Sequence, residues 1–229
     1  PHLFSSAASD VYKRQPNSRT ELFDYLSNKN IPEQQIIDTG MCLRPDDGGA
    51  VYDRFRDRRM YPIRDSRGRC IAFGGRAMSQ NANAKYLNSP ETKLFDKGRS
   101  LYNFSTARSA LRTQQSLIVA EGYMDVIALS QASFKASVAP LGTAITKDQL
   151  ALIWRISPSP VVALDGDRAG VNAAYRLIDL ALPLIETGKT IKFALMPKGF
   201  DPDDLIKERG RDAMQTLIDE AISLADLLW

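Results

Sequence analysis

Residues 161–170 read VVALDGDRAG, and this stretch decides the fold class. Four apolar residues end at Asp165, which is typical of a short buried strand, and helical spacing follows from about residue 169 to 186. The same succession of apolar strand and helix occurs over residues 117–131, 137–156 and 191–209. Alternating strands and helices predict an α/β domain with a mainly parallel sheet that helices cover on both faces.

The segment before this domain has a different pattern. Residues 60–64 and 69–74 predict two strands, and Asp-Ser-Arg-Gly at 65–68 has the chemistry of the turn between them. Helices are expected at residues 18–30, 33–38 and 105–114.

We expect four parts from these patterns: a non-native or disordered start, a basic α+β subdomain, the α/β domain, and the beginning of a helical part. Their ranges are residues 1–15, 16–115, 116–210 and 211–229.

The composition of the chain excludes several classes of protein and several kinds of active site. The 229 residues include two cysteines, Cys42 and Cys70, and one histidine, His2. These counts exclude a disulfide-stapled scaffold, a multi-cysteine zinc site and most histidine-dependent active sites. The sequence has neither a run of about 18 uncharged apolar residues nor a secretory leader. We therefore expect a soluble, cytoplasmic protein without a membrane partner, whose chemistry uses acidic and basic side chains.

Charge is unevenly distributed along the chain. Residues 53–112 contain 14 Lys and Arg against 5 Asp and Glu, a net charge of +9. Residues 116–229 contain 11 basic and 15 acidic residues, a net charge of −4. A basic surface favours polyanions such as nucleic acids, and clustered carboxylates favour metal cations. The alternative is that both segments only present solvated faces.

Acidic residues follow three predicted strands at the point where each strand ends. Because the carboxyl ends of parallel strands meet at one edge of a sheet, these side chains are expected to lie together. Hard divalent cations such as Mg²⁺ or Mn²⁺ prefer oxygen ligands and assist displacement at phosphorus. The alternative is that the same residues only cap helices. The candidate metal ligands are Glu121, Asp125, Asp165, Asp167, Asp201 and Asp203.

The residues around these acids resemble the Toprim signature of topoisomerases and primases. The similarity rests on Glu-Gly-Tyr-Met-Asp at 121–125, Asp-Gly-Asp-Arg-Ala-Gly at 165–170 and Asp-Pro-Asp at 201–203. The resemblance implies a Toprim-type sheet with flanking helices. It also implies that Glu121, Asp165 and Asp167 are catalytic.

Upstream motifs are similar to the RNA polymerase domain of bacterial DnaG-type primases. They are residues 54–65, Phe-Gly-Gly-Arg at 73–76, Lys-Tyr-Leu-Asn-Ser-Pro-Glu-Thr at 85–92 and residues 95–102. The resemblance implies that template DNA and the nucleotide triphosphate contact a set of basic and polar residues. These are Arg54, Arg56, Arg64, Arg76, Lys85, Tyr86, Asn88 and Lys97.

The resemblance implies a DNA primase catalytic core that makes short RNA primers on single-stranded DNA by metal-dependent nucleotidyl transfer during replication. The expected partners are single-stranded DNA, ribonucleoside triphosphates and the RNA primer. The zinc-binding domain of the family, and the domain through which it binds the replicative helicase, are expected to be absent here. Two alternatives stay open: a Toprim nuclease or topoisomerase-like enzyme, and a non-catalytic nucleic-acid-binding module.

Overall fold

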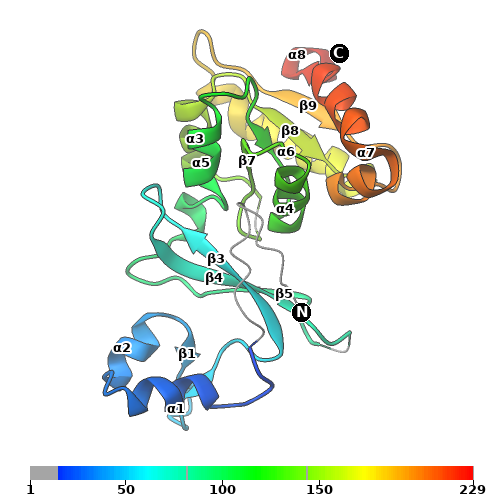
Figure 1. The fold of residues 1–229 in the computed structure, drawn as a ribbon. Helices are drawn as coiled ribbons and strands as arrows, with labels where there is room; N and C mark the ends of the chain where they lie inside the picture. The colour runs from blue at the N-terminus through cyan, green and yellow to red at the C-terminus, as the bar shows by residue number, and fades with distance from the viewer. Residues whose placement is uncertain (1–14, 81, 143, 229) are drawn as a thin grey trace. The chain divides into compact units, whose positions relative to one another are not determined.

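The computed structural model describes residues 15–80, 82–142 and 144–228. The chain forms two compact units (Figure 1). One unit runs to Asp65 and continues over Arg69–Asp96; the other comprises Ser66–Gly68 and everything from Lys97 onward. Residues 1–14, which include almost all of the segment expected to be non-native, lie outside the described residues.

The first unit begins with two short helices packed on a small strand pair. Helix α1 spans Glu21–Asn28 and α2 spans Glu33–Asp38, and strands β1 (Cys42–Leu43) and β2 (Tyr52–Asp53) pair antiparallel. The carboxylate of Asp53 accepts hydrogen bonds from the backbone N–H groups of Leu22 and Phe23, at 2.8 and 3.0 Å. This buried side chain from β2 therefore satisfies two of the orphan donors at the start of α1.

A three-stranded antiparallel sheet completes this unit. Strands β3 (Arg58–Arg64) and β4 (Cys70–Ala77) form the predicted hairpin, and β5 (Tyr86–Asn88) adds to the far edge of β4. The polar residues around β5 favour a loop. The strand itself was not predicted, because three residues are too few to show the alternation of a strand.

The second unit contains the predicted mainly parallel sheet. Its strand order is β10-β9-β8-β6-β7, and every pair is parallel except β10 with β9. The strands are β6 (Ile118–Val119), β7 (Ser137–Val138), β8 (Val161–Leu164), β9 (Lys192–Leu195) and β10 (Ile222–Ser223). The α/β fold class expected from the sequence is thereby confirmed.

Helices cover both faces of this sheet, as the continuous apolar strands predict. Residues of α3, α5, α6 and α8 share one apolar core with alternate strand residues such as Val119, Val162 and Phe193. Helices α4 and α7 pack against each other and contact β7 and β8. The helices are α3 (Phe104–Ala110), α4 (Tyr123–Gln131), α5 (Lys147–Ile156), α6 (Arg168–Ala181), α7 (Pro202–Asp219) and α8 (Leu224–Leu228).

The structure corrects two features of the expected helices. Helix α6 ends at Ala181 and passes into a 3-10 turn over Leu182–Leu184, because Pro183 lacks the N–H that the helix requires. The C-terminal part is not only helical, since β10 pairs with β9 before α8 begins. Within the described residues, none of the helices is long and apolar enough to cross a membrane.

Candidate active site

Acidic residues lie at the carboxyl ends of three adjacent parallel strands. Glu121 comes two residues after β6, and Asp165 directly follows β8. Asp201 caps α7, the helix that follows β9, and Asp203 lies in its first turn. Because β6, β8 and β9 are neighbours in the sheet, the strand order brings these predicted residues to one edge.

Backbone contacts hold the loops after β8 and β9 against each other. The N–H of Gly166 donates to the carbonyl of Phe200 at 2.9 Å, and the N–H of Gly199 donates to the carbonyl of Gly166 at 3.0 Å. A Cβ atom at position 166 would lie 1.9 Å from the carbonyl oxygen of Pro197, so only glycine permits this approach. The contact brings the Asp-Gly-Asp segment beside the loop that leads into α7.

Glu121 is tied to the same loop from the neighbouring strand. Its Oε1 accepts a hydrogen bond from the backbone N–H of Asp165 at 3.2 Å. The first turn of helix α6 also packs closely against Asp165, since a Cβ atom at Gly170 would lie 2.2 Å from the carbonyl oxygen of Asp165. Close packing on both sides therefore fixes the backbone of Asp165.

Three of the predicted metal ligands also act as helix caps. Asp167 Oδ1 accepts from the N–H of Gly170 at 2.8 Å, and Asp201 Oδ1 accepts from the N–H of Asp204 at 2.7 Å. Asp125 Oδ2 accepts from the N–H of Gly122 at 3.1 Å. The capping alternative thus describes part of what these residues do, but each carboxylate uses only one oxygen for it.

Burial of the carboxylates, and after it their mutual repulsion, sets the electrostatics of this edge. Burial, followed by the negative charges of Asp201, Asp165 and Asp203, raises the pKa of Asp125 to about 7. Burial, followed by the charges of Glu121 and Asp201, raises the pKa of Asp165 to about 6. Like charges held this closely favour a cation between them.

One carboxylate oxygen of this group lacks a partner. Oδ1 of Asp165 is buried and makes no hydrogen bond. A buried acceptor without a donor costs free energy, which a bound cation would offset. Asp203 differs from the others because it already forms an ion pair with Lys207 inside α7.

The donor set fits a hard divalent cation by its chemistry, because every candidate ligand is a carboxylate oxygen. Over residues 15–80, 82–142 and 144–228, no three such side chains converge closely enough to hold an ion as they stand. The candidate ligands share one edge of the sheet because the strands that carry them, β6, β8 and β9, are neighbours.

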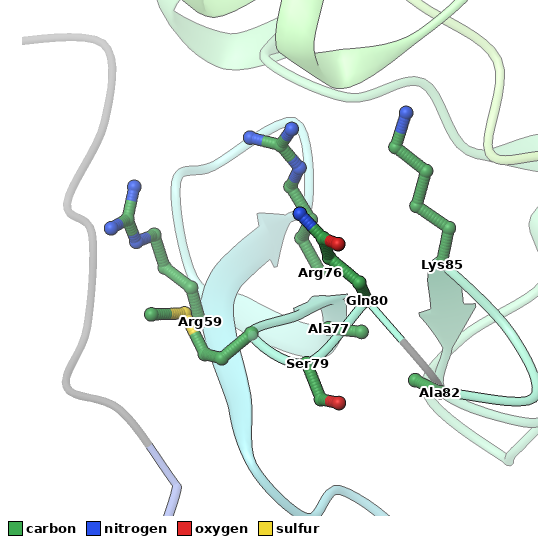
Figure 2. A pocket seen from close by; sticks show the side chains of 8 residues that line it. Arg59, Arg76, Ala77, Ser79, Gln80, Ala82 and Lys85 are labelled. Atoms are coloured by element: carbon green, nitrogen blue, oxygen red, sulfur yellow. The ribbon is translucent and has the colours of Figure 1, made fainter.

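A basic cavity of about 450 Å³ lies on the three-stranded sheet of the first unit (Figure 2). Arg59 of β3 and Arg76 of β4 are directly opposite each other in the strand register, and Lys85 precedes β5. Figure 2 shows their three side chains extending toward the same side of the sheet, with Gln80 beside Arg76. Like charges placed opposite each other destabilise a strand pair, so this arrangement suits an anion.

Some of the predicted basic residues line this cavity and others do not. Arg76 and Lys85 line the cavity, and Lys85 Nζ lies 5.6 Å from the ring centre of the exposed Tyr86. Arg54 serves the fold instead: its Nε and Nη2 donate to the carbonyl of Asn88 at 3.0 and 2.8 Å, and burial lowers its pKa.

Three further residues of the predicted set do not line this cavity. Arg56 is exposed, Arg64 ends β3, and Lys97 begins a 3-10 turn (Lys97–Arg99) in the second unit.

Sequence reasoning missed Arg59 and Gln80 as lining residues. The alternation of β3 contains the signal for Arg59, because its neighbours Arg58 and Met60 are buried while Arg59 is exposed. Arg58 donates to the carbonyls of Gly75 and Ala84 and so belongs to the interior. Gln80 lies in a loop, where no periodic signal exists.

Comparison with known proteins agrees with this arrangement. A model described as the DNA primase catalytic core, N-terminal domain, matches residues 12–108, and a Toprim domain model matches residues 115–194. The DNA primase of Pseudomonas aeruginosa is 44% identical over 203 residues, which are 89% of this chain and 30% of that protein. The chain spans about a third of the length of the curated relatives it matches.

Two solved structures are similar over most of the chain. The Escherichia coli primase catalytic core has a TM-score of 0.85 and 41% identity, covering 94% of this chain and 68% of that one. A DnaG primase catalytic domain bound to single-stranded DNA has a TM-score of 0.85 and 40% identity, covering 94% of this chain and 67% of that one.

Proposed function

Because the chain belongs to the DnaG-type DNA primase catalytic-core family, we propose that it synthesises short RNA primers on single-stranded DNA during replication. The reaction is nucleotidyl transfer: a 3′-hydroxyl attacks the α-phosphorus of a ribonucleoside triphosphate, and pyrophosphate leaves. This role implies a cytoplasmic location at the replication fork. The observation that carries the proposal is the carboxylate edge formed by Glu121, Asp165 and Asp201.

The repulsion at this edge supports a metal-dependent reaction. The raised pKa values of Asp125 and Asp165, and the unpartnered Oδ1 of Asp165, are the features expected of ligands that await a cation. Mg²⁺ or Mn²⁺ bound there supplies charge neutralisation for the triphosphate and for the leaving pyrophosphate. The proposed ligands are Glu121, Asp125, Asp165, Asp167, Asp201 and Asp203.

Glu121 is the residue best suited to handle a proton. Its side chain is exposed, and the hydrogen bond from the N–H of Asp165 holds Oε1 beside the acidic loop. We assign it the proton of the attacking hydroxyl or a place among the metal ligands. Asp165 and Asp167 are fixed by the close contacts of Gly166 and Gly170, so their positions do not depend on a flexible loop.

The basic cavity supports the handling of phosphate groups. Arg59, Arg76 and Lys85 present three cations around one cavity, and the exposed ring of Tyr86 offers a face for stacking on a base. One structurally similar primase domain was solved bound to single-stranded DNA. We therefore assign this surface to template DNA or to the triphosphate, together with the other basic residues that match the family motifs. In the family, a separate domain binds the replicative helicase.

The experiment that tests this division of labour compares synthesis with binding. The complete gene product is given labelled ribonucleotides, single-stranded DNA and Mg²⁺. Asp165→Ala is expected to abolish RNA synthesis while leaving the affinity for single-stranded DNA within about threefold of wild type, because the charge lost lies outside the basic surface. Equal losses of synthesis and binding would contradict the division.

The products of the same reaction separate the alternative functions. New RNA supports the primase, whereas cut or relaxed DNA supports a Toprim nuclease or topoisomerase-like enzyme. Binding without any metal-dependent product supports a non-catalytic module. All the named relatives quoted above are primases, which favours the first outcome.

A further inference from the structure

The turn that carries Lys97 is held by the start of helix α5. Gln149, in the first turn of α5, is fully buried, and its Nε2 donates to the carbonyl of Lys97 at 2.7 Å and to that of Ser100 at 2.8 Å. Thr146, the N-cap of α5, donates from Oγ1 to the carbonyl of Gly98 at 2.5 Å. Three carbonyls within four residues therefore accept hydrogen bonds from two side chains of another element.

These contacts go beyond what capping α5 requires. The capping box itself consists of the Gln149 N–H donating to Thr146 Oγ1 at 3.1 Å and the Thr146 N–H donating to Gln149 Oε1 at 3.0 Å. A glutamate at position 149 would complete that box equally well, since only an acceptor is needed. It would not donate to the turn. The side-chain amide of Gln149 donates to the carbonyls of Lys97 and Ser100, and a glutamate could not make these two bonds.

A second contact ties the same turn to α5 at the surface. Arg99 Nε lies 2.9 Å from Asp148 Oδ2, and both side chains are more than half exposed. An exposed ion pair contributes little to holding a structure in place. The buried bonds from Gln149 and Thr146 therefore fix the path of the turn.

We propose that Gln149 and Thr146 are positioning residues that hold the Lys97 turn in the geometry needed for nucleotide or template phosphate. The proposal rests on the proposed function, in which Lys97 contacts phosphate. Neither side chain touches substrate in this scheme; both act through the backbone of residues 97–100. A displacement of about 1 Å in such a turn costs up to about a hundredfold in rate.

The decisive variant is Gln149→Glu. It keeps the size of the side chain and the acceptor that caps α5, and it replaces the donor with an oxygen that faces two carbonyl oxygens. The matched control is Gln114→Glu, because Gln114 also bridges two backbone groups: its Nε2 donates to the carbonyl of Ser133, and its Oε1 accepts from the N–H of Ala136. We expect Gln149→Glu to lower kcat/KM for ribonucleotides tenfold to a hundredfold. Gln114→Glu is expected to stay within about twofold of wild type.

A double-mutant cycle with Lys97→Ala separates positioning from a general loss of structure. If Gln149 acts through Lys97, adding Gln149→Glu to Lys97→Ala lowers kcat/KM by less than about threefold. Independent, multiplying losses would overturn the positioning role, as would a Gln149→Glu variant with wild-type kinetics. If Gln149→Glu does not fold, the cycle with Lys97→Ala is repeated with Thr146→Val against Thr146→Ser, because only serine retains the hydroxyl that donates to Gly98 and accepts the capping bond from Gln149.

The cycle also distinguishes this proposal from the proposed function. A wild-type protein that makes no RNA would contradict the function itself. A wild-type protein that makes RNA, together with a fully active Lys97→Ala variant, would overturn the positioning role alone.

Discussion

Replacing Asp165 with asparagine removes one negative charge from the acidic edge while keeping the shape of the side chain. Burial and the neighbouring carboxylates raise the pKa of Asp165 from 3.8 to about 6. A rise of that size corresponds to a free energy of about 3 kcal/mol by which the folded protein disfavours the charged form of Asp165. Because this carboxylate is partly exposed, solvent screening reduces the figure to about 1 kcal/mol. We therefore expect Asp165→Asn to increase the free energy of unfolding by about 1 kcal/mol at pH 7.5 without divalent cations.

The sign of the pH dependence follows from the same shift. The folded state binds the proton of Asp165 more tightly than the unfolded state, so this residue's favourable contribution is fully present below pH 3.8 and is lost as the pH rises through about 6. The raised pKa of Asp125 causes a further loss of folding stability as the pH rises through about 7. The stability advantage of Asp165→Asn should therefore shrink as the pH falls from 7.5 toward 5.

Urea unfolding in EDTA, followed by fluorescence, measures this difference. Trp154 is buried in the same unit and reports its unfolding. Adding Mg²⁺ should stabilise the wild type more than the variant, because ligand binding to the folded state alone raises stability. A variant that is less stable than wild type at pH 7.5 in EDTA would refute the unfavourable burial and repulsion of the Asp165 charge, on which this reasoning depends.

Three further predictions concern packing, charge and capping. Gly166→Ala should cost about 1–3 kcal/mol in urea unfolding, because its Cβ would lie 1.9 Å from a backbone carbonyl oxygen. Gly188→Ala, whose Cβ meets open space at a φ of +83°, should cost about 1 kcal/mol, and a cost at position 166 no larger than this would contradict the steric argument. Arg59→Ala should weaken single-stranded DNA binding and lower the salt dependence by about 0.7 in log–log slope, whereas the exposed Arg112→Ala should change neither. Unchanged binding by Arg59→Ala would show that the cavity is not part of the DNA-binding surface. Asp53→Ala should destabilise α1 by about 1–2 kcal/mol, seen as faster hydrogen exchange of its first amides, and unchanged exchange would show that the cap is dispensable.

The placement of the acidic residues was predictable because it depends on a general property of parallel sheets. Glu121 and Asp165 follow apolar runs at once, Asp201 follows the next one after a short loop, and the carboxyl ends of such strands share an edge whatever the details of packing. The pattern around Asp165 therefore predicted both the α/β fold and the arrangement of its neighbours. The helical pattern expected to end at residue 209 is interrupted there, since Gly210 departs from the helical angles of α7 with a φ of 80°.

Features that depend on long-range pairing were not predictable in the same way. The opposition of Arg59 and Arg76 follows from the strand register, which the sequence of either strand does not specify alone. Strand β10 has only two residues and exists because β9 offers an open edge. The role of Gly166 becomes visible only when the loop containing Pro197 is placed against it.

The most direct test of the central claim is RNA synthesis by the complete gene product and its Glu121→Gln variant on single-stranded DNA, with Mg²⁺ or Mn²⁺ and labelled ribonucleotides. We predict short RNA with the wild type, and a loss of at least a hundredfold with Glu121→Gln, although the variant still folds and binds DNA. Undiminished synthesis by Glu121→Gln would contradict the assignment of catalysis to the acidic edge.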